Sequence, residues 1–556
     1  MPRPEDDVEA PLSGPGPVRA RRCVVGLLVV ASMVACGSPK LDESVRAGPA
    51  TAADTGSRTA DVADQDESSP RRGGTARIAT TGEPPHLDPS RSTDTLVLLI
   101  GGHVYETLFT SDAEHRPVPL LAAGHDVSED GLRHTVTLRR DVRFHDGQPL
   151  TAPDVIASIE RWMDNSGLGA GLLEATDELI AIDDHTVEFR LLEPFGVLTT
   201  ALSRQLQAAT IHPASVVERS DRTRLAAPIG TGPYELAEWL PGRHIRLERF
   251  DAYRPPSGTS DGYAGAKAQY LDAIEFVPMP EEASRVAAIR SGDVHHLEAV
   301  SPDQLDVLRR DDDLAIEVAP ADVWLNLVLN LRSPSLAETE IRRAIQLALD
   351  HDEILRAAVG EGYYALGPDL LPGIADWSSD AGADRYDQRD PEAARHLLLA
   401  NDAQSTPLRL MTSLEQRSEY NAALVIEQQL EAVGFAVQLE VLDGATLSGR
   451  RSKEDQWELY LASASFRPDP IMRNLTRDAT GWWDDPAKEA LLDELRGSID
   501  PDQRHQIWRE VQHRFHEEVP RIKIGDLRRV VVHRSELHGL GPTTLQPDLS
   551  NAWLAP

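Results

Sequence analysis

The segment from residue 407 to residue 442 constrains the fold more than any other, because its pattern changes from strand to helix and back to strand. PLRLMTS is followed by EYNAALVIEQQLEAVG, with apolar residues at helical spacing, and then by FAVQLEV. Gly434 stands where a glycine commonly ends a helix. Two strands joined by a helix pair in parallel through a right-handed crossover. The sequence therefore predicts α/β lobes and argues against a sandwich, a barrel or a helix bundle.

The chain has 556 residues, which is too many for a single hydrophobic core. At roughly 150 residues per domain, about three to four units are expected. ELIAIDDHTVEFRL and GPYELAEWLPGRHIRLERF have the alternation of hairpins, and Asp390-Pro391 is typical of a helix start. This mixture of hairpins and helices again favours several α/β units.

The stretch RFHDGQPLTAPDVIASIERW, residues 143–162, offers two interpretations. His145 beside Asp146 could be half of a general-base pair, or both could lie in a turn before a helix. RHTVTLRR before the stretch alternates as a strand, and the residues after it place apolar side chains on one helical face. Thr151 and Asp154 have the spacing of a capping box. We therefore predict a turn with a solvent-facing histidine, followed by a helix.

A basic flank and a short apolar run predict that residues 1–35 are a signal peptide. The run CVVGLLVVASMVA has 13 residues, too few to span a bilayer, where about 20 are needed. Its ending with Cys36, MVACG, resembles a bacterial lipobox, which implies cleavage before Cys36 and a lipid on its sulfur. The alternative is a soluble secreted protein with an incidental cysteine.

Residues 36–73 are expected to comprise the lipidated Cys36 and a disordered tether. Residues 37–73 contain no aromatic residue and almost no large aliphatic one, so the segment cannot bury enough surface to fold. The other cysteine, Cys23, lies inside the predicted leader. The mature body should then contain no disulfide and no structural zinc-thiolate site.

The charge balance argues against a nucleic-acid partner. The chain has 56 basic and 90 acidic residues, a net charge of -34, whereas a phosphate backbone requires a basic protein face. Net charge mostly reports on solubility, so it does not identify the ligand.

A series of motifs resembles one known family. It comprises HLDPSRSTDT, VYETLF, PLLAAGHDVSEDGLRHTVTLRRDVRFHDGQPLTAPDV, IGTGPYELAEW, PGRHIRLERFDAY, RVAAIRSGDVH, LNLRSPSLAETEIRRAIQLALDHDEI, PEAARHLLLAND and REVQHRFHEEVPRI. In this order and spacing they resemble the large solute-binding lipoproteins of ABC importers for peptides, nickel and related ligands, family 5. The resemblance covers most of residues 74–530.

The resemblance implies a periplasmic-binding-protein-like type II α/β fold, with two lobes around a cleft plus an extra subdomain. The implied ranges are a central lobe of 74–91, 213–322 and 525–556, an extra subdomain of 92–212, and a second lobe of 323–524.

The implied function is that of a lipid-anchored receptor on the extracytoplasmic face of the bacterial cytoplasmic membrane. It would bind a peptide or peptide-like molecule, close around it and deliver it to ABC permease subunits. We expect a monomer with no catalysis, no cofactor and no metal site. Other ligands remain open: a nickel chelate, a sugar or an opine. Two further classes are a lipid-anchored secreted hydrolase and a receptor-like scaffold that signals.

The ligand-contacting residues are less constrained. Peptide-binding members often place an aspartate just before a strand-end Asp-Pro, but Phe466 stands three residues before Asp469 here. This departure puts oligopeptide recognition in doubt. Charged side chains could clamp a ligand carboxylate and aromatic ones could stack, or both could be ordinary ion pairs and packing. The candidates are Trp324, Asn326, Tyr363, Tyr364, Ser465, Arg467, Asp469, Trp482 and Trp483.

Sequence signals for catalysis are weak. GTSDG at 258–262 matches the GxSxG hydrolase elbow, but FDAYRPPS before it cannot be a buried strand. His516-Glu517 does not continue into HExxH, and no Walker A sequence is present. His295 and His296 are adjacent on a predicted strand, so their side chains should point to opposite faces.

Overall fold

The computed structural model describes residues 69–556 except 222–223, 298–299, 466 and 542–546. The predicted signal peptide 1–35 and Cys36 lie outside the described residues, as does nearly all of the predicted tether 36–73. In the part of the chain that is described, no helix has an apolar stretch of the length that a bilayer requires.

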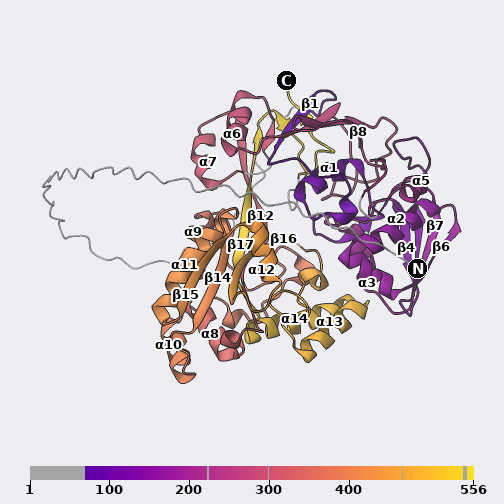
Figure 1. Cartoon of the computed structure of the whole chain (residues 1–556). Helices are drawn as coiled ribbons and strands as arrows, with labels where there is room; N and C mark the ends of the chain where they lie inside the picture. The colour runs from indigo at the N-terminus through magenta and orange to yellow at the C-terminus, as the bar shows by residue number, and fades with distance from the viewer. Residues whose placement is uncertain (1–68, 222–223, 298–299, 466, 542–546) are drawn as a thin grey trace, which may run out of the picture. The chain divides into compact units, whose positions relative to one another are not determined.

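One large mixed sheet organises these residues. Its order is β15-β14-β16-β12-β17-β11-β1-β10-β9-β8, with β13 also pairing β17. The two longest strands, β12 (Leu314–Leu329) and β17 (Arg521–Arg534), pair antiparallel at its centre. Their register shifts between Val318 and Val323 and again after Leu325, so the pair bends partway along. In Figure 1 these strands run from the α6 and α7 side of the sheet to the α11 and α14 side.

One side of the sheet is built around β1, which pairs in parallel with β10 and β11. Buried apolar side chains of β1, β9 and β10 pack with α1, while β11 packs with α6 and α7. The elements here are β1 (Thr75–Thr80), α1 (Thr95–Val104), β8 (Tyr234–Leu240), β9 (His244–Arg249), β10 (Ala273–Pro278), α6 (Glu282–Ser291), β11 (His296–Leu297), α7 (Pro302–Leu308), β18 (Leu537–His538) and β19 (Trp553–Leu554).

A separate four-stranded antiparallel sheet has the order β4-β5-β7-β6 and its own core. The predicted helix after the 143–162 turn is present as α2, and the Thr151 amide donates to the Asp154 carboxylate at 2.9 Å. The elements are β2 (Phe109–Ser111), β3 (Pro117–Pro119), β4 (Ala122–Val127), β5 (Arg133–Leu138), α2 (Ala152–Asn165), α3 (Gly167–Ala175), β6 (Thr176–Asp183), β7 (Thr186–Leu191), α4 (Leu198–Ser203) and α5 (Ala214–Glu218).

The predicted strand-helix-strand unit is confirmed. β14 (Pro407–Ser413) and β15 (Ala436–Leu442) pair in parallel and are joined by α11 (Arg417–Val433), which ends at Gly434 with a φ of 115°. The other elements are α8 (Thr339–Ala348), α9 (His351–Val359), β13 (Tyr364–Ala365), α10 (Pro391–Ala400), α12 (Gly444–Arg451), β16 (Leu459–Ser465), α13 (Pro486–Gly497) and α14 (Pro501–Glu518). Short 3-10 turns are η1 (Pro89–Arg91), η2 (Pro334–Leu336), η3 (Ala375–Trp377), η4 (Ala383–Arg385) and η5 (Pro470–Arg473).

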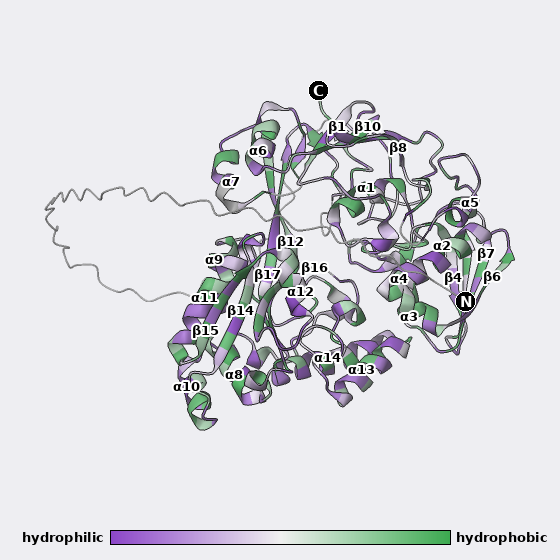
Figure 2. Ribbon diagram, in the orientation of Figure 1, coloured by the Kyte–Doolittle hydropathy of each residue, from purple (hydrophilic) through white to green (hydrophobic). Residues whose placement is uncertain are grey.

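Helices α13 and α14 carry both hydrophilic and hydrophobic residues, as amphipathic helices that bury one face do (Figure 2). The buried face of α14 includes Trp508 and Phe515, which pack in one cluster with Trp324 of β12 and Trp483. This cluster contains two of the residues that the sequence proposed as ligand contacts, Trp324 and Trp483.

Candidate ligand-binding site

Trp324 and Asn326 lie inside the sheet on β12, between β16 and β17. The Trp324 ring is 2% exposed and packs against Phe515, with 6.1 Å between the ring centroids. The Arg473 guanidinium lies over the Trp324 ring, 5.0 Å from the centroid of that ring. Asn326 is buried and donates to the Ala462 carbonyl oxygen at 2.6 Å. Both side chains therefore contribute to the core, and ligand contact by either stays a prediction.

Tyr363 and Tyr364 lie where β13 meets β17. The Tyr363 hydroxyl accepts a hydrogen bond from the guanidinium of Arg309. The Tyr364 hydroxyl donates to the Asp352 carboxylate at 2.5 Å, and this bond is the main cause of the raised pKa of Tyr364. Both hydroxyls are thus engaged by side chains of neighbouring helices.

Asp469 is held by two partners inside the protein. It is 1% exposed and caps η5, accepting a hydrogen bond from the Ile471 amide at 3.0 Å. Arg504 of α14 donates to both of its carboxylate oxygens, at 3.0 and 2.8 Å. A buried carboxylate with a bidentate arginine partner has little capacity left for a ligand.

Ser465 ends β16, where its backbone pairs with Val323. Arg467 follows in the short loop before η5 and is half-buried, and this burial lowers its pKa. Arg473 ends η5 and is 7% exposed. Burial, followed by the charge of Arg467, lowers the pKa of Arg473 to about 9 despite the opposing effect of nearby carboxylates. The positive charges of Arg467 and Arg473 therefore act on each other.

The two tryptophans at 482 and 483 have separate environments. Trp482 packs on Trp457, with ring centroids 5.6 Å apart. The Arg332 guanidinium lies 5.1 Å from the centroid of the Trp482 ring. Trp483 is buried, donates from Nε1 to Glu518 at 2.7 Å and lies 5.0 Å from the Lys488 ammonium. These contacts are packing contacts, and stacking on a ligand is untested.

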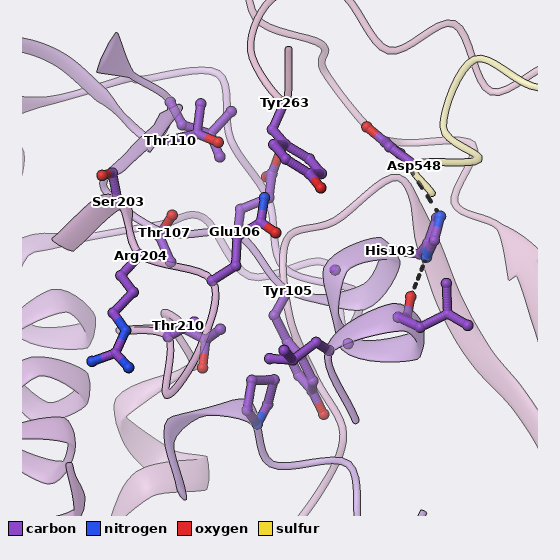
Figure 3. A pocket seen from close by; sticks show the side chains of 18 of the residues that line it. His103, Tyr105, Glu106, Thr107, Thr110, Ser203, Arg204, Thr210, Tyr263 and Asp548 are labelled. Carbon is purple, nitrogen blue, oxygen red and sulfur yellow. Dashed lines mark hydrogen bonds and ion pairs between the residues drawn. The ribbon is translucent and has the colours of Figure 1, made fainter. Parts of the chain in front are cut away.

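A cavity of about 90 Å³ lies elsewhere, among residues of α1, β2, the end of α4 and the loop before β10. One water needs only about 10–15 Å³ of such space, so the cavity can accept a small organic group. Its polar lining consists of His103, Tyr105, Glu106, Thr107, Thr110, Ser203, Arg204, Gln205, Thr210, Tyr263, Lys267 and Asp548. Figure 3 shows Arg204 with Ser203, Thr107 and Thr210 at one end, and His103 with Asp548 at the other.

At the His103 end of the cavity, the polar side chains have partners within the protein. The His103 ring donates to the Leu99 carbonyl oxygen at 2.7 Å and accepts from the Leu549 amide at 2.9 Å, and burial lowers its pKa. Burial alone would raise the pKa of Asp548, but the charges of Lys267 and His103 outweigh it and lower that pKa. These groups form the wall of the cavity.

Glu106 is fully buried, and burial raises its pKa. Its carboxylate accepts from the Thr231 hydroxyl at 2.9 Å and from the Tyr253 hydroxyl at 2.8 Å. Both bonds fix the Glu106 carboxyl group in the cavity wall.

Arg204 differs from these groups. It terminates α4, and burial, followed by the charge of Arg467, lowers its pKa to about 10. Its Nε atom is buried without a hydrogen-bond partner among the described residues. Sequence reasoning missed this residue, because nothing in ALSRQLQ distinguishes it from a surface arginine.

The surroundings of His145 and Ser260 do not have the geometry that a hydrolase site needs. His145 lies in a turn as predicted, but it does not face solvent: its Nε2 donates to the Gly232 carbonyl oxygen at 3.0 Å and its Nδ1 accepts from the Gly230 amide at 3.3 Å. Its ring also packs on Phe250 at 4.9 Å. The side chain is half-buried and both ring nitrogens are hydrogen-bonded, so the sequence prediction of a solvent-facing histidine was wrong. Burial lowers the pKa of His145 to about 4. Ser260 lies in a loop between β9 and β10, not between a strand and a helix.

The family model described as "Bacterial extracellular solute-binding proteins, family 5 Middle" matches residues 116–482. The chain belongs to family 5 of the bacterial extracellular solute-binding proteins. This family 5 protein is 26% identical over 461 residues to a probable peptide ABC transporter periplasmic-binding protein, y4tO, from Sinorhizobium fredii, covering 80% of this chain and 86% of the relative. It is 25% identical to the glutathione-binding protein GsiB of Pectobacterium atrosepticum, covering 82% and 88%.

Among solved structures, this family 5 protein resembles the ABC transporter substrate-binding protein CtaP from Listeria monocytogenes. The TM-score is 0.75 at 23% identity, over 87% of this chain and 100% of CtaP. The predicted α/β fold of the two-lobed type II class is therefore confirmed. The residue boundaries of the lobes and of the extra subdomain stay a prediction.

Proposed function

We propose that this solute-binding protein is the receptor of an ABC importer, which binds a peptide or peptide-like ligand between its lobes and delivers it to permease subunits. Membership of family 5 across residues 116–482 carries this proposal. The name of the Sinorhizobium relative supports the peptide class, and that of the Pectobacterium relative supports a modified peptide.

Other ligands of the same class are a nickel chelate, a sugar or an opine. Catalysis is disfavoured, because both ring nitrogens of His145 are bonded to backbone groups and the Ser260 hydroxyl is contacted by the Asn551 amide at 3.3 Å, not by a histidine. The receptor therefore binds its ligand without a covalent step.

The location of this receptor follows from the N-terminal sequence. A lipid on Cys36 would anchor the protein to the extracytoplasmic face of the cytoplasmic membrane, with residues 37–73 as the tether. The protein would act as a monomer. Metabolic labelling with a palmitate analogue tests the anchor, and Cys36→Ser should abolish both the label and membrane retention.

Native mass spectrometry of the full chain tests the binding function. The protein is purified gently and compared with a sample that has been unfolded and refolded. We expect a discrete excess mass that disappears on refolding and returns when the recovered ligand is added back. At 100 times its dissociation constant, that ligand should add about 2.7 kcal/mol to the unfolding free energy. Steady turnover of an ester or peptide substrate, lost in Ser260→Ala, would instead establish the hydrolase.

A further inference from the structure

Arg204 carries a charge that no carboxylate neutralises within the described part of the chain. It follows α4 directly, is half-buried, and lines the cavity together with Ser203, Thr107 and Thr210 (Figure 3). Its Nε atom is buried without a hydrogen-bond partner, and its guanidinium forms neither a hydrogen bond nor an ion pair with any described residue. A desolvated charge without a counter-ion is costly, so an anionic group is expected to bind there.

The other charged groups of the lining act on one another. Burial raises the pKa values of both Asp548 and Glu106, and the Lys267 charge opposes that effect on each. Asp548 also accepts a hydrogen bond from the Ser550 amide at 2.8 Å, and Glu106 accepts from two hydroxyl groups. The lining therefore provides carboxyl groups for Lys267 and none for Arg204.

The hydroxyl groups shown with Arg204 are not available as donors to a ligand. Thr107 and Ser203 donate to backbone carbonyl oxygens, the latter at 3.0 Å. Thr210 donates to Nε2 of His212 at 3.0 Å, because the other ring nitrogen of His212 donates to a backbone carbonyl oxygen. The guanidinium is thus the main donor on this side of the cavity. Its parallel N–H groups match the two oxygens of a carboxylate, whereas a phosphate would have further oxygens left without donors.

Much of the remaining lining is apolar. Leu98, Leu120 and Ala208 are 7%, 4% and 6% exposed, and Pro89 and Pro547 lie beside them in the lining. The volume of about 90 Å³ has room for a short aliphatic chain, whose burial against these side chains is favourable. The cavity therefore suits a carboxylate that carries a short aliphatic group next to it.

We propose that the cavity binds the carboxyl-terminal end of the ligand, with the terminal carboxylate on the Arg204 guanidinium and a short aliphatic side chain in the apolar part. The inference rests on the proposed receptor function and specifies its ligand as a peptide with a free carboxyl terminus. A ligand whose carboxyl group is amidated loses the charge that Arg204 binds.

Saturation-transfer NMR on the full chain tests the site with butyrate and butyramide. The two probes have nearly the same shape, but only butyrate has the charge and both oxygens. Isothermal titration calorimetry then compares the tripeptide Ala-Ala-Ala with its carboxyl-terminal amide. We expect butyrate and the free tripeptide to bind about ten- to a hundredfold more tightly than their amides, because hydrogen bonds to a charged group contribute that much.

Substitutions then assign the residue. Arg204→Gln should weaken butyrate and the free tripeptide about ten- to a hundredfold and leave the two amides unchanged. Arg204→Lys should lose less, since it keeps the charge but not the planar fork. Without a probe, Arg204→Gln should unfold at the same temperature as the parent protein or higher, because it removes an uncompensated charge. The matched control is Arg190→Gln, an exposed arginine of β7 paired with Glu188, which should change neither probe affinity nor stability.

Each outcome decides the inference. Equal binding of acids and amides, or undiminished butyrate binding in Arg204→Gln, would overturn it, and tripeptide binding would still leave the receptor function standing. Loss of butyrate binding in Lys267→Gln but not in Arg204→Gln would place the carboxylate at Lys267 and overturn it too. If butyrate behaves as expected but no tripeptide binds and native mass spectrometry finds no excess mass, the cavity is a carboxylate site and the receptor function is refuted.

Discussion

The buried ion pair between Asp469 and Arg504 allows a test of whether Asp469 stabilises the fold or contacts the ligand. Asp469→Asn removes the negative charge but retains an oxygen that can accept from the Ile471 amide, now 3.0 Å away. It leaves the Arg504 guanidinium, 7% exposed, without its carboxylate partner. Breaking a buried ion pair from one side typically costs 3–5 kcal/mol. Because the capping bond survives, we expect a loss near the lower end, about 3 kcal/mol.

Urea unfolding followed by tryptophan fluorescence measures this loss. The Trp377 ring lies 4.9 Å from the Arg504 guanidinium and should report on the site directly. Asp380→Asn is the control, because Asp380 is 83% exposed in its pair with Arg509 and should change stability by less than about 0.5 kcal/mol. An unchanged urea midpoint together with loss of the bound ligand would refute this account and make Asp469 a ligand contact.

Three further perturbations follow from the same packing. Burial lowers the pKa of His212 to about 4, below its unfolded value near 6.5. The free energy of unfolding should therefore be highest above pH 6.5 and fall by up to about 3 kcal/mol as the pH drops from 6.5 through 4. Urea midpoints across this pH range should show the fall, and His212→Gln should make the fall smaller. Gly232→Ala would place a Cβ 2.5 Å from a backbone carbonyl oxygen of α1 and should destabilise by about 1–3 kcal/mol in thermal unfolding, whereas Gly102→Ala, with nothing within 4 Å, should not. Trp483→Phe removes the 2.7 Å bond to Glu518 and should cost about 1–2 kcal/mol in urea unfolding without changing ligand affinity; a large affinity loss would contradict its packing role.

The elements that sequence predicted correctly are those whose signals are local. The 407–442 unit combines a change of periodicity with Gly434, and α2 combines an apolar face with the Thr151 and Asp154 cap. Each signal lies within one or two turns of the chain, so no knowledge of tertiary contacts is needed. The pairing of β12 with β17 has no such signal, because the strands are far apart in sequence and could pair in many registers.

The candidate site shows even more clearly the difference between local signals and tertiary contacts. The sequence identified Trp324, Trp483 and Asp469 as groups capable of binding a ligand, which is correct chemistry for the side chains considered alone. In the fold, each finds an internal partner: Phe515, Glu518 and Arg504 respectively. A polar or aromatic side chain can contact a ligand only if no other part of the protein already pairs with it, and such partners are not revealed by local sequence patterns.

Net charge illustrates the converse, because it is a property of the whole chain and not of any one site. A total of -34 would suggest a cationic ligand, but charges on the exposed surface are screened beyond about 8 Å at physiological ionic strength. Charges in a partly desolvated site are screened much less, so a few buried groups there outweigh many distant carboxylates. Arg204 is such a group, because its Nε atom is buried without a hydrogen-bond partner among the described residues, and nothing in ALSRQLQ marks it in the sequence.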